Sequence, residues 1–537
     1  MKSLRWFIAL LLVCQHMMAQ VNTKALDAVM QDRFPAGAPG AVVIVAKDGE
    51  VLYHKAFGLA NLEQQLPMTT TAVFRIGSNT KQFTAAGILR LAEEGKLSLD
   101  DEITKFIKDY PTQGQHITIR HLLTHTSGVR NYTGMAKFTP DVRRKDLTPA
   151  ELVAFFSNEP MDFTPGTRFL YDNSGYVLLG YIIELVTGKP YARYIREQFF
   201  TPLGMSHSFY DSAQTIIPGR VGGYKQGKDG YLNADYLSMQ LPYAAGSLLS
   251  TTTDLLRWYE AVMNDRVISK QSREKAQASY VLPDGHLTGY GYGWETGRVQ
   301  DYPSVKHSGS INGFQSFTLY LPDQHIFVAI LSNNESIGDL DKPSAEMAAI
   351  TMGKPYQTDE KFQREKTLSR CTGVYKTAGG ERVVALQDGQ LYWYARGGGK
   401  RRLMPLGGDR FRLAQTLVTM QFAGDSVAVS STGLPETGIR IGAAPAPLKK
   451  AVVTVETMQA YCGHYLFPDK MDFEVVLEEG KLYGQVGQDR KELLPAARNR
   501  YYAKDLDAEL VFNEDAKGKV VSVTKRQNSV AEGKRVE

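Results

Sequence analysis

The chain has 537 residues, of which 43% are hydrophobic, 10% aromatic and 22% charged. This composition is typical of a folded globular protein and excludes wholesale disorder, a collagen helix and a coiled coil. The formal net charge is only +5, and no run of like charges forms a nucleic-acid-binding tail. Three cysteines are too few for a disulfide scaffold, and no Cys/His cluster has the spacing of a zinc site. The length is compatible with about three or four ordinary domains, or with one large domain and smaller appendages.

Residues 1–19 have the pattern of a signal peptide, with a charged start, an apolar run at 6–13 and Ala19 at a cleavage position. The apolar run is too short to form a permanent membrane span. Cys14 raises the alternative of a lipoprotein, but Val13 occupies a position where such signals need a small residue. We therefore expect an exported protein, periplasmic or secreted, without an integral membrane span.

The next elements in chain order are a strand pair and a long helical region. Residues 40–53 predict a β-hairpin around Asp48-Gly49, because Asp-Gly accepts the positive φ angles of a two-residue turn. Apolar periodicity and end signals predict three helices, at 79–94, 148–156 and 176–186. A second strand pair is predicted at 315–321 and 326–331. Strands at both ends of a helical insert predict one α/β (α+β) domain over 22–355, with an antiparallel sheet flanked by helices.

Beyond residue 355 the chain changes to short strands and glycine turns, and a pattern recurs. Gly373 and Gly463 open two copies 90 residues apart, and Gly-x-Leu-Tyr ends at Tyr392 in the first copy and at Tyr483 in the second. Such a repeat indicates two similar units. We predict two small all-β, barrel-like repeats and an Ala/Pro-rich linker, in the order 365–442, 443–450 (linker) and 451–530.

Cys371 and Cys462 stand near the starts of the two repeats. Disulfides persist in exported proteins, but the two cysteines are one position out of register when the repeats are aligned. A disulfide between them and two separate buried thiols are both compatible with the sequence.

A basic stretch with neighbouring aromatic residues lies in the first repeat; it comprises Tyr392, Trp393, Tyr394, Arg396, Lys400, Arg401, Arg402, Arg410 and Arg412. Such a stretch forms either the solvated face of a sheet or a platform for single-stranded nucleic acid. In an exported β unit we favour the solvated face, and we expect no nucleic-acid partner.

The strongest chemical motif is Ser78-x-x-Lys81 at the start of the first predicted helix. Residues three apart on a helix share one face, so the Lys81 amine can reach the Ser78 hydroxyl. The helix N-terminus adds positive potential, and a partly desolvated lysine can lose its proton and act as a base. The same spacing also occurs at Ser272/Lys275 and Ser522/Lys525. Ser78 differs from these because it opens a helix with an apolar face.

A second element is Tyr171-Asp172-Asn173, directly before the predicted helix at 176–186. A phenol and an amide on such a loop can project into a cleft. The pattern alone is weak, because Tyr-x-Asn occurs again at 231–233.

A third element, His307-Ser308-Gly309-Ser310, comes just before the second strand pair. By itself His-Ser-Gly is more typical of a surface turn. At the edge of a cleft, however, the backbone N–H of Ser310 can pair with that of Ser78 and form an oxyanion hole.

Together these motifs resemble those of the serine β-lactamase and penicillin-binding protein superfamily, especially its class C-like branch, which uses Tyr-x-Asn. The resemblance spans about residues 25–350 and follows the family order. Its segments are FRIGSNTK at 74–81, LLTHTSG at 122–128, YDNSG at 171–175, AGSLLS at 245–250 and HSG at 307–309.

The resemblance implies a serine β-lactamase-like domain followed by the two barrel-like repeats. It implies that Ser78 is the acylated nucleophile, that Lys81 is its base partner and that Tyr171 is the acid/base at the leaving group. The implied substrate-binding and oxyanion positions are Asn173, His307, Gly309 and Ser310.

His307 stands where β-lactamases of this branch carry lysine. Lysine is a permanent cation whereas histidine titrates near neutral pH, so we do not expect efficient β-lactam hydrolysis. His-x-Gly together with two C-terminal β units resembles bacterial D-aminopeptidase, in which a loop of the last barrel enters the active site. The acidic loop around Asp469 is the corresponding candidate, with an ordinary solvated turn as the alternative.

We predict an exported serine hydrolase that cleaves amide or peptide bonds of small substrates, including D-amino-acid derivatives, through an acyl-enzyme. The alternatives are a carboxylesterase of the same branch and a penicillin-binding-like sensor that does not turn over. We expect no cofactor and no metal, since His121 and His125 are spaced for one but lack a third ligand. The oligomeric state is left open.

Overall fold

A computed structural model describes residues 22–356, 368–387, 389–414, 416–431, 433–445, 451–487 and 489–536. The predicted signal peptide at 1–19, with Cys14, lies outside these residues, as does the part of the predicted linker at 446–450. Residues 22–356, together with 433–434, belong to one compact unit, and the strands of both barrels lie in a second. Within the described ranges, no helix combines the length and the apolar character that a membrane span requires.

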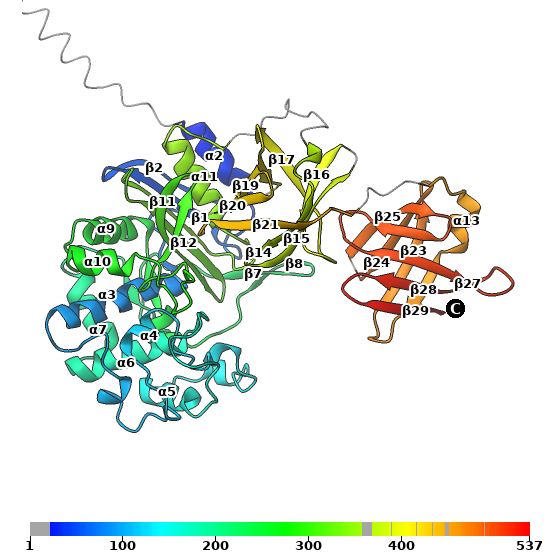
Figure 1. The fold of residues 1–537 in the computed structure, drawn as a ribbon. Helices are drawn as coiled ribbons and strands as arrows, with labels where there is room; N and C mark the ends of the chain where they lie inside the picture. Colours follow the sequence, from blue (N-terminus) through cyan, green and yellow to red (C-terminus); the bar gives the residue numbers. More distant parts are fainter. Residues whose placement is uncertain are drawn as a thin grey trace, which may run out of the picture. The chain divides into compact units, whose positions relative to one another are not determined.

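The first unit is built on a six-stranded sheet in which all neighbours are antiparallel (Figure 1). Its order is β10 (Glu295–Val299), β11 (Tyr302–Ile311), β12 (Phe314–Leu321), β13 (Ile326–Ser332), β1 (Ala41–Lys47) and β2 (Glu50–Phe57). Strand β1 pairs with β13, so the first hairpin and the late strands form one sheet on either side of the helical insert. The predicted fold class is therefore confirmed.

The hairpin between β1 and β2 turns as the sequence predicts. Lys47 pairs with Glu50, and the two residues between them have positive φ angles, 52° at Asp48 and 80° at Gly49. These are the angles of the primed turns whose twist matches that of a hairpin.

Helices cover the sheet on both faces. The helices α2 (Thr23–Gln31) and α11 (Asp341–Thr351) pack on each other, and α9 (Thr252–Met263) packs against β1 and β13. Strand β13 is buried over its whole length and β1 over all but its last residue, which explains their nearly continuous apolar sequence.

The helical insert contains the three predicted helices, as α3 (Thr80–Glu93), α5 (Pro149–Ser157) and α6 (Ser174–Thr187). Helix α5 begins with a capping box in which Thr148 and Glu151 bind each other's backbone N–H groups. The other helices are α4 (Ile119–Leu123), α7 (Tyr191–Ile195), α8 (Tyr243–Gly246) and α10 (Lys270–Ala276), with a π-turn η5 (Arg196–Phe200) and 3-10 turns η1 (Gly77–Asn79), η2 (Ile103–Lys105), η3 (Tyr132–Gly134) and η4 (Val142–Arg144).

Short strands connect the helical insert to the sheet. They are β3 (Leu59–Asn61) with β4 (Leu66–Pro67), β5 (Phe74–Arg75) with β9 (Leu248–Ser250) and β6 (Phe209–Tyr210), and β7 (Tyr224–Gly227) with β8 (Gly230–Asn233). Strand β5 leads directly into η1 and α3, so the small sheet fixes where α3 begins. Further along α3, Phe83 stacks on Trp258 with ring centroids 3.9 Å apart, in the core of the unit.

The second unit contains two closed eight-stranded antiparallel barrels, which confirms the repeat. The first is formed by β14 (Gly373–Thr377), β15 (Gly380–Gln387), β16 (Gln390–Tyr394), β17 (Arg401–Gly407), β18 (Arg410–Leu413), β19 (Thr419–Ala423), β20 (Ser426–Ser430) and β21 (Glu436–Gly442). The second follows α13 (Val455–Ala460) and is formed by β22 (Gly463–Leu466), β23 (Asp472–Glu478), β24 (Lys481–Val486), β25 (Asp489–Ala497), β26 (Arg500–Ala503), β27 (Glu509–Glu514), β28 (Val520–Arg526) and β29 (Val530–Val536).

The barrels correspond in detail. Both have a register shift at the same place in the fourth strand, after Pro405 in the first and after Pro495 in the second. Strand β29 extends past residue 530, where the sequence predicts that the second repeat ends.

The side chains singled out in the repeats have the following surroundings within the barrels. Arg401 and Arg410 are exposed and lie on strands whose inner face contains buried Leu403 and Phe411. No disulfide joins Cys371 to the other described cysteine, and burial raises the pKa of the Cys371 thiol to about 11. Asp469 accepts a hydrogen bond from the backbone N–H of Met471, which is ordinary turn chemistry.

Candidate active site

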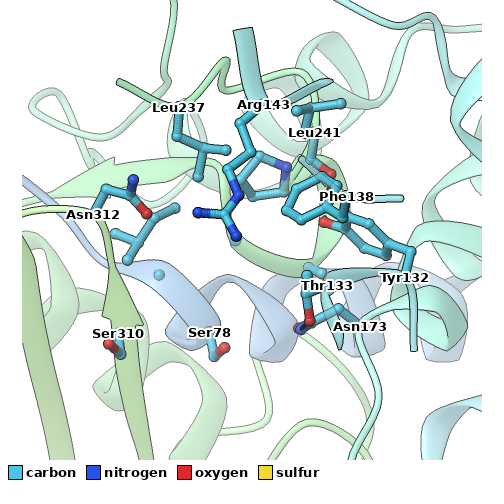
Figure 2. Close-up of a pocket in the computed structure, with 15 residues that line it drawn as sticks. Ser78, Tyr132, Thr133, Phe138, Arg143, Asn173, Leu237, Leu241, Ser310 and Asn312 are labelled. Atoms are coloured by element: carbon cyan, nitrogen blue, oxygen red, sulfur yellow. Dashed lines mark hydrogen bonds between the residues drawn. The ribbon is translucent and has the colours of Figure 1, made fainter. Parts of the chain in front are cut away.

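Ser78 lies in η1, the 3-10 turn that precedes α3, rather than in the helix itself. Gly77 has a φ of 49°, a backbone conformation that glycine adopts without strain. Four residues after β5 starts, the chain thus presents Ser78 on a tight turn at the N-terminal end of a long helix. Ser78 also lines a cavity on the surface of this unit (Figure 2).

Lys81 points back from the first turn of α3 to Ser78. Its Nζ donates to Ser78 Oγ at 3.1 Å and also to the backbone oxygen of Ala245 at 3.0 Å. The side chain is fully buried. Burial lowers the pKa of the Lys81 ammonium to about 7, although the charge of Asp172 acts in the opposite direction.

Asn173 provides the third acceptor for Lys81. Its Oδ1 accepts from Lys81 Nζ at 2.8 Å, and its Nδ2 donates to Thr133 Oγ1 at 3.3 Å. Asn173 Oδ1 and the oxygen of Ala245 are therefore two fixed acceptors, and each occupies one hydrogen-bonding position of the amine. Its third position faces Ser78, and when Lys81 is neutral a lone pair points there.

Tyr171 flanks Ser78 from another side. The Ser78 hydroxyl is near enough to favour the charged form of the phenol, and Lys81 Nζ lies 4.8 Å from the centre of the Tyr171 ring. Burial raises the pKa of the Tyr171 phenol well above its usual range, and the Ser78 hydroxyl offsets this only in part. At neutral pH the phenol keeps its proton, whereas burial makes the Lys81 ammonium lose its proton far more readily than an ordinary lysine, so Lys81 is the stronger candidate for the base.

An aromatic and polar cluster supports Tyr171 from behind. The ring of His125 lies 4.2 Å from that of Tyr171 and 4.7 Å from that of Tyr290, measured between centroids. His125 is completely buried, and its Nδ1 accepts from the backbone N–H of Asp172 at 3.2 Å. These contacts fix the ring plane next to Tyr171.

Strand β11 approaches η1 more closely than side chains permit. A Cβ at Gly309 would lie 2.1 Å from the backbone oxygen of Ile76, and one at Gly77 would lie 3.0 Å from the backbone nitrogen of Ser310. The two glycines therefore allow the backbones at Ser78 and Ser310 to meet at the cavity. Such a close approach is one requirement of an oxyanion hole made of two backbone N–H groups.

A buried hydrogen-bond network fixes η1 on β12. Ser316 Oγ donates to the oxygen of Ile76 at 2.7 Å and accepts from Asn79 Nδ2 at 2.8 Å. Thr318 Oγ1 donates to Asn79 Oδ1 at 2.7 Å. Because both groups come from one strand, the turn that carries Ser78 is held rigidly against the sheet.

His307 is buried and uncharged. Its Nε2 forms a 2.8 Å hydrogen bond with the Tyr290 hydroxyl, and its Nδ1 lies 2.6 Å from the oxygen of Ser308. Burial, assisted by the charge of Lys81, lowers the pKa of His307 to about 3. Burial also raises the pKa of Glu295, whose carboxylate lies 3.9 Å from the ring. Both shifts favour neutral forms, so we interpret this contact as polar packing rather than an ion pair.

The cavity at Ser78 has a volume of about 320 Å³, enough for a small acyl group. Three of the predicted site residues line it, namely Ser78, Asn173 and Ser310. Lys81, Tyr171, His307 and Gly309 are not among its lining residues. Figure 2 shows the other walls, which include Tyr132, Phe138, Arg143, Leu237 and Asn312.

Residues 25–350 match the family model described as Beta-lactamase. The chain belongs to this family. It is 31% identical over 454 residues to penicillin-binding protein 4* of Bacillus subtilis strain 168, a match that covers 78% of this chain and 98% of the relative. The family's three motif segments around Ser78, Tyr171 and His307 are thus brought to one place by the fold.

Two solved structures of similar fold extend the comparison. The octameric penicillin-binding protein homologue from Pyrococcus abyssi is 28% identical, with a TM-score of 0.55, and the match covers 87% of this chain and 99% of that one. A D-stereospecific amidohydrolase from Streptomyces sp. is 25% identical, with a TM-score of 0.53, over 62% of this chain and 98% of that one. Solved structures of similar fold therefore include a hydrolase.

The other Ser-x-x-Lys matches lie in different surroundings. Ser272 and exposed Lys275 lie on α10, and Ser522 is a buried residue of β28. No group of three metal-ligand side chains occurs within the described ranges, and His121 instead caps α4 through Thr118.

Sequence reasoning missed two residues at the site. Tyr290, the partner of His307, lies in a glycine-rich loop before β10 without a motif of its own. Arg143, which lines the cavity, comes from the short turn η4 in a polar loop. Neither position carries a periodicity or spacing that indicates a cleft.

Proposed function

We propose that this protein is a serine hydrolase that cleaves amide bonds of small substrates through an acyl-enzyme on Ser78. The observation that carries the proposal is the Lys81 amine, buried 3.1 Å from Ser78 Oγ with a pKa of about 7. A neutral amine at that position can take the serine proton at physiological pH.

In the proposed acylation, Ser78 Oγ bonds to the substrate carbonyl carbon and passes its proton to Lys81. The N–H groups of Ser78 and Ser310 stabilise the oxyanion. Tyr171, still protonated, is placed to relay a proton to the leaving nitrogen, and the C–N bond breaks. Water then attacks the ester by the reverse proton path, the C–Oγ bond breaks and Ser78 regains its proton.

For the substrate we propose small amides and peptides, including those of D-amino acids. The similarity to the D-stereospecific amidohydrolase and to penicillin-binding protein 4* supports this choice. His307 supports it too, because a neutral imidazole does not supply the cation that a β-lactam carboxylate needs. We further propose that the protein is exported after removal of residues 1–19.

The test is multiple-turnover release of p-nitroaniline from N-acetyl-D-alanyl-p-nitroanilide and from D-alanyl-p-nitroanilide, which has a free amine. Ser78→Ala is the matched blank. Sustained release that Ser78→Ala abolishes is the expected result. Release from the free amine alone would favour the D-aminopeptidase-like form of the proposal.

Two other outcomes would change the proposal. Ser78-dependent hydrolysis of p-nitrophenyl acetate without release from either anilide would replace the amidase by a carboxylesterase. A single stoichiometric acylation without turnover would indicate a penicillin-binding-like sensor.

A further inference from the structure

Arg143 is the only charged side chain among the fifteen residues of the described chain that line the cavity at Ser78. Figure 2 shows its guanidinium directed into the cavity, between Phe138 and Leu237, on the side that faces Ser78. The walls around it are apolar side chains or uncharged polar groups. Arg143 itself is half-buried.

The backbone and a ring hold Arg143 in place. Its N–H donates to the oxygen of Thr139 at 3.0 Å, and its own oxygen accepts from the N–H of Ser238 at 2.8 Å. The guanidinium carbon lies 5.3 Å from the centre of the Phe138 ring, a cation–π distance. The side chain is therefore oriented before a ligand arrives.

The guanidinium lacks a partner of opposite charge. Its Nε is buried and has no hydrogen-bond partner, and it forms no ion pair with any carboxylate in the described ranges. The pKa of the Asp235 carboxylate is lowered mainly by Lys225, with which it pairs at 2.6 Å, and Arg143 contributes less to this shift. The Asp235 side chain is 69% exposed. The five N–H donors of a guanidinium suit a carboxylate, which it can bind through two parallel hydrogen bonds.

The geometry also indicates which part of a substrate lies at Arg143. Under the proposed function the leaving group must face Tyr171 and Lys81, which supply its proton and do not line the cavity. The acyl part is then left for the cavity, between Asn173, Ser310 and Arg143.

We propose that Arg143 binds a carboxylate on the acyl part of the substrate, so that the preferred substrates are amides of small acyl groups with a negative charge. This inference rests on the proposed function and deepens it. One guanidinium neutralises one carboxylate, whereas a doubly charged phosphate would leave a charge unpaired in a cavity lined by no second cation.

The test compares three p-nitroanilides that differ only in the N-acyl group of D-alanine: acetyl, succinyl and glutaryl. The succinyl and glutaryl groups carry a carboxylate at two different distances from the amide. We expect the wild-type kcat/KM to be higher for one of the anionic substrates than for the acetyl one, by about tenfold, as a charge-assisted hydrogen bond supplies. Arg143→Gln should abolish this preference for the anionic substrate, and Arg143→Lys should retain part of it.

The control is Arg144→Gln, which removes an exposed arginine from the same turn η4 and should leave the ratio as in wild type. A ratio of two substrates on one enzyme sample is independent of the folded fraction, so a loss of stability in Arg143→Gln cannot imitate the effect. Calorimetric binding of N-succinyl-D-alanine and N-acetyl-D-alanine to Ser78→Ala, with and without Arg143→Gln, measures the same preference without turnover.

The possible failures are distinct. If the wild type turns over all substrates with a ratio near one, or if the ratio survives Arg143→Gln, the role of Arg143 is overturned and the hydrolase stands. If no substrate is turned over, the proposed function fails. Equal binding of the two acids to Ser78→Ala would then overturn the role of Arg143 as well.

Discussion

The two sides of Ser78 differ in the charge of their side chains. On the inner side, Lys81, Tyr171 and His307 are packed against one another, and burial shifts each pKa toward the neutral form. On the cavity side, Arg143 keeps a permanent charge and has no carboxylate partner among the described residues. We therefore propose that proton transfer takes place on the inner side and substrate recognition on the cavity side.

This division has a physical reason. A base must exchange a proton near neutral pH, which a desolvated lysine does and a fully hydrated one does not. A group that recognises an anion must instead stay charged at all working pH values, which suits arginine. In β-lactamases of the class C-like branch a lysine stands at the position of His307, whereas here that position is neutral and the cation lies across the cavity.

The largest effect on the inner side is expected for Lys81→Met, which removes the amine and keeps an unbranched side chain that is one atom shorter. We expect kcat/KM for N-acetyl-D-alanyl-p-nitroanilide to fall by about a thousandfold, the size of a general-base contribution. Lys275→Met is the matched control, because Lys275 has the same spacing from a serine but is exposed on α10. A loss of less than about tenfold in Lys81→Met would assign the base to another group.

The approach of β11 to η1 is tested by Gly309→Ala. Its new Cβ would lie 2.1 Å from the oxygen of Ile76, so the strand must move away and carry the N–H of Ser310 with it. We expect a loss of about a hundredfold in kcat, as for removal of one oxyanion donor. Rates should be normalised to the folded fraction, because overpacking also costs about 1–3 kcal/mol of stability.

The matched control for Gly309→Ala is Gly37→Ala, since a Cβ at Gly37 has no atom within 4 Å. It should retain the wild-type rate. A Gly309→Ala variant as active as Gly37→Ala would mean that the spacing between β11 and η1 does not set the rate.

The inner wall was largely predictable from sequence because its geometry is local. Ser78 and Lys81 meet through one helical turn, and Asn173 directly precedes α6, so spacing and element boundaries indicate them. The barrels were predictable for a similar reason, since a 90-residue repeat fixes corresponding strands and even the shift after Pro405 and Pro495.

The cavity wall and the charge states were not predictable in the same way. Arg143 reaches the cavity from a 3-10 turn, and its neighbours Leu237 and Asn312 come from distant loops without a shared pattern. His307 could be identified as a site position, but its charge depends on burial and on Tyr290, which only the tertiary structure brings to it.

The pH dependence of kcat/KM also distinguishes the inner side, with Lys81, from the cavity side, with Arg143. Since Lys81 must be neutral to accept a proton, kcat/KM should rise with pH through about 7 and fall about tenfold per unit below it. The measurement uses N-acetyl-D-alanyl-p-nitroanilide from about pH 5 to 9, because this substrate does not ionise in that range. An inflection near the ordinary lysine pKa, about 10.4, would show that Lys81 is not desolvated in solution.

The smallest effect is expected for His307→Gln. This variant tests whether His307, which is neutral, takes part in binding the substrate carboxylate. Loss of the hydrogen bond with Tyr290 should lower kcat/KM by about fivefold for the acetyl and succinyl substrates alike, because a neutral hydrogen bond contributes about 1 kcal/mol. Tyr290→Phe removes the same bond from the other partner and should have the same effect. In both variants the ratio of succinyl to acetyl rates should stay within about twofold of wild type, since neither removes a charge. A ratio that collapses in His307→Gln and survives in Tyr290→Phe would mean that His307 binds the carboxylate as a cation, and the separation of the two walls would fail.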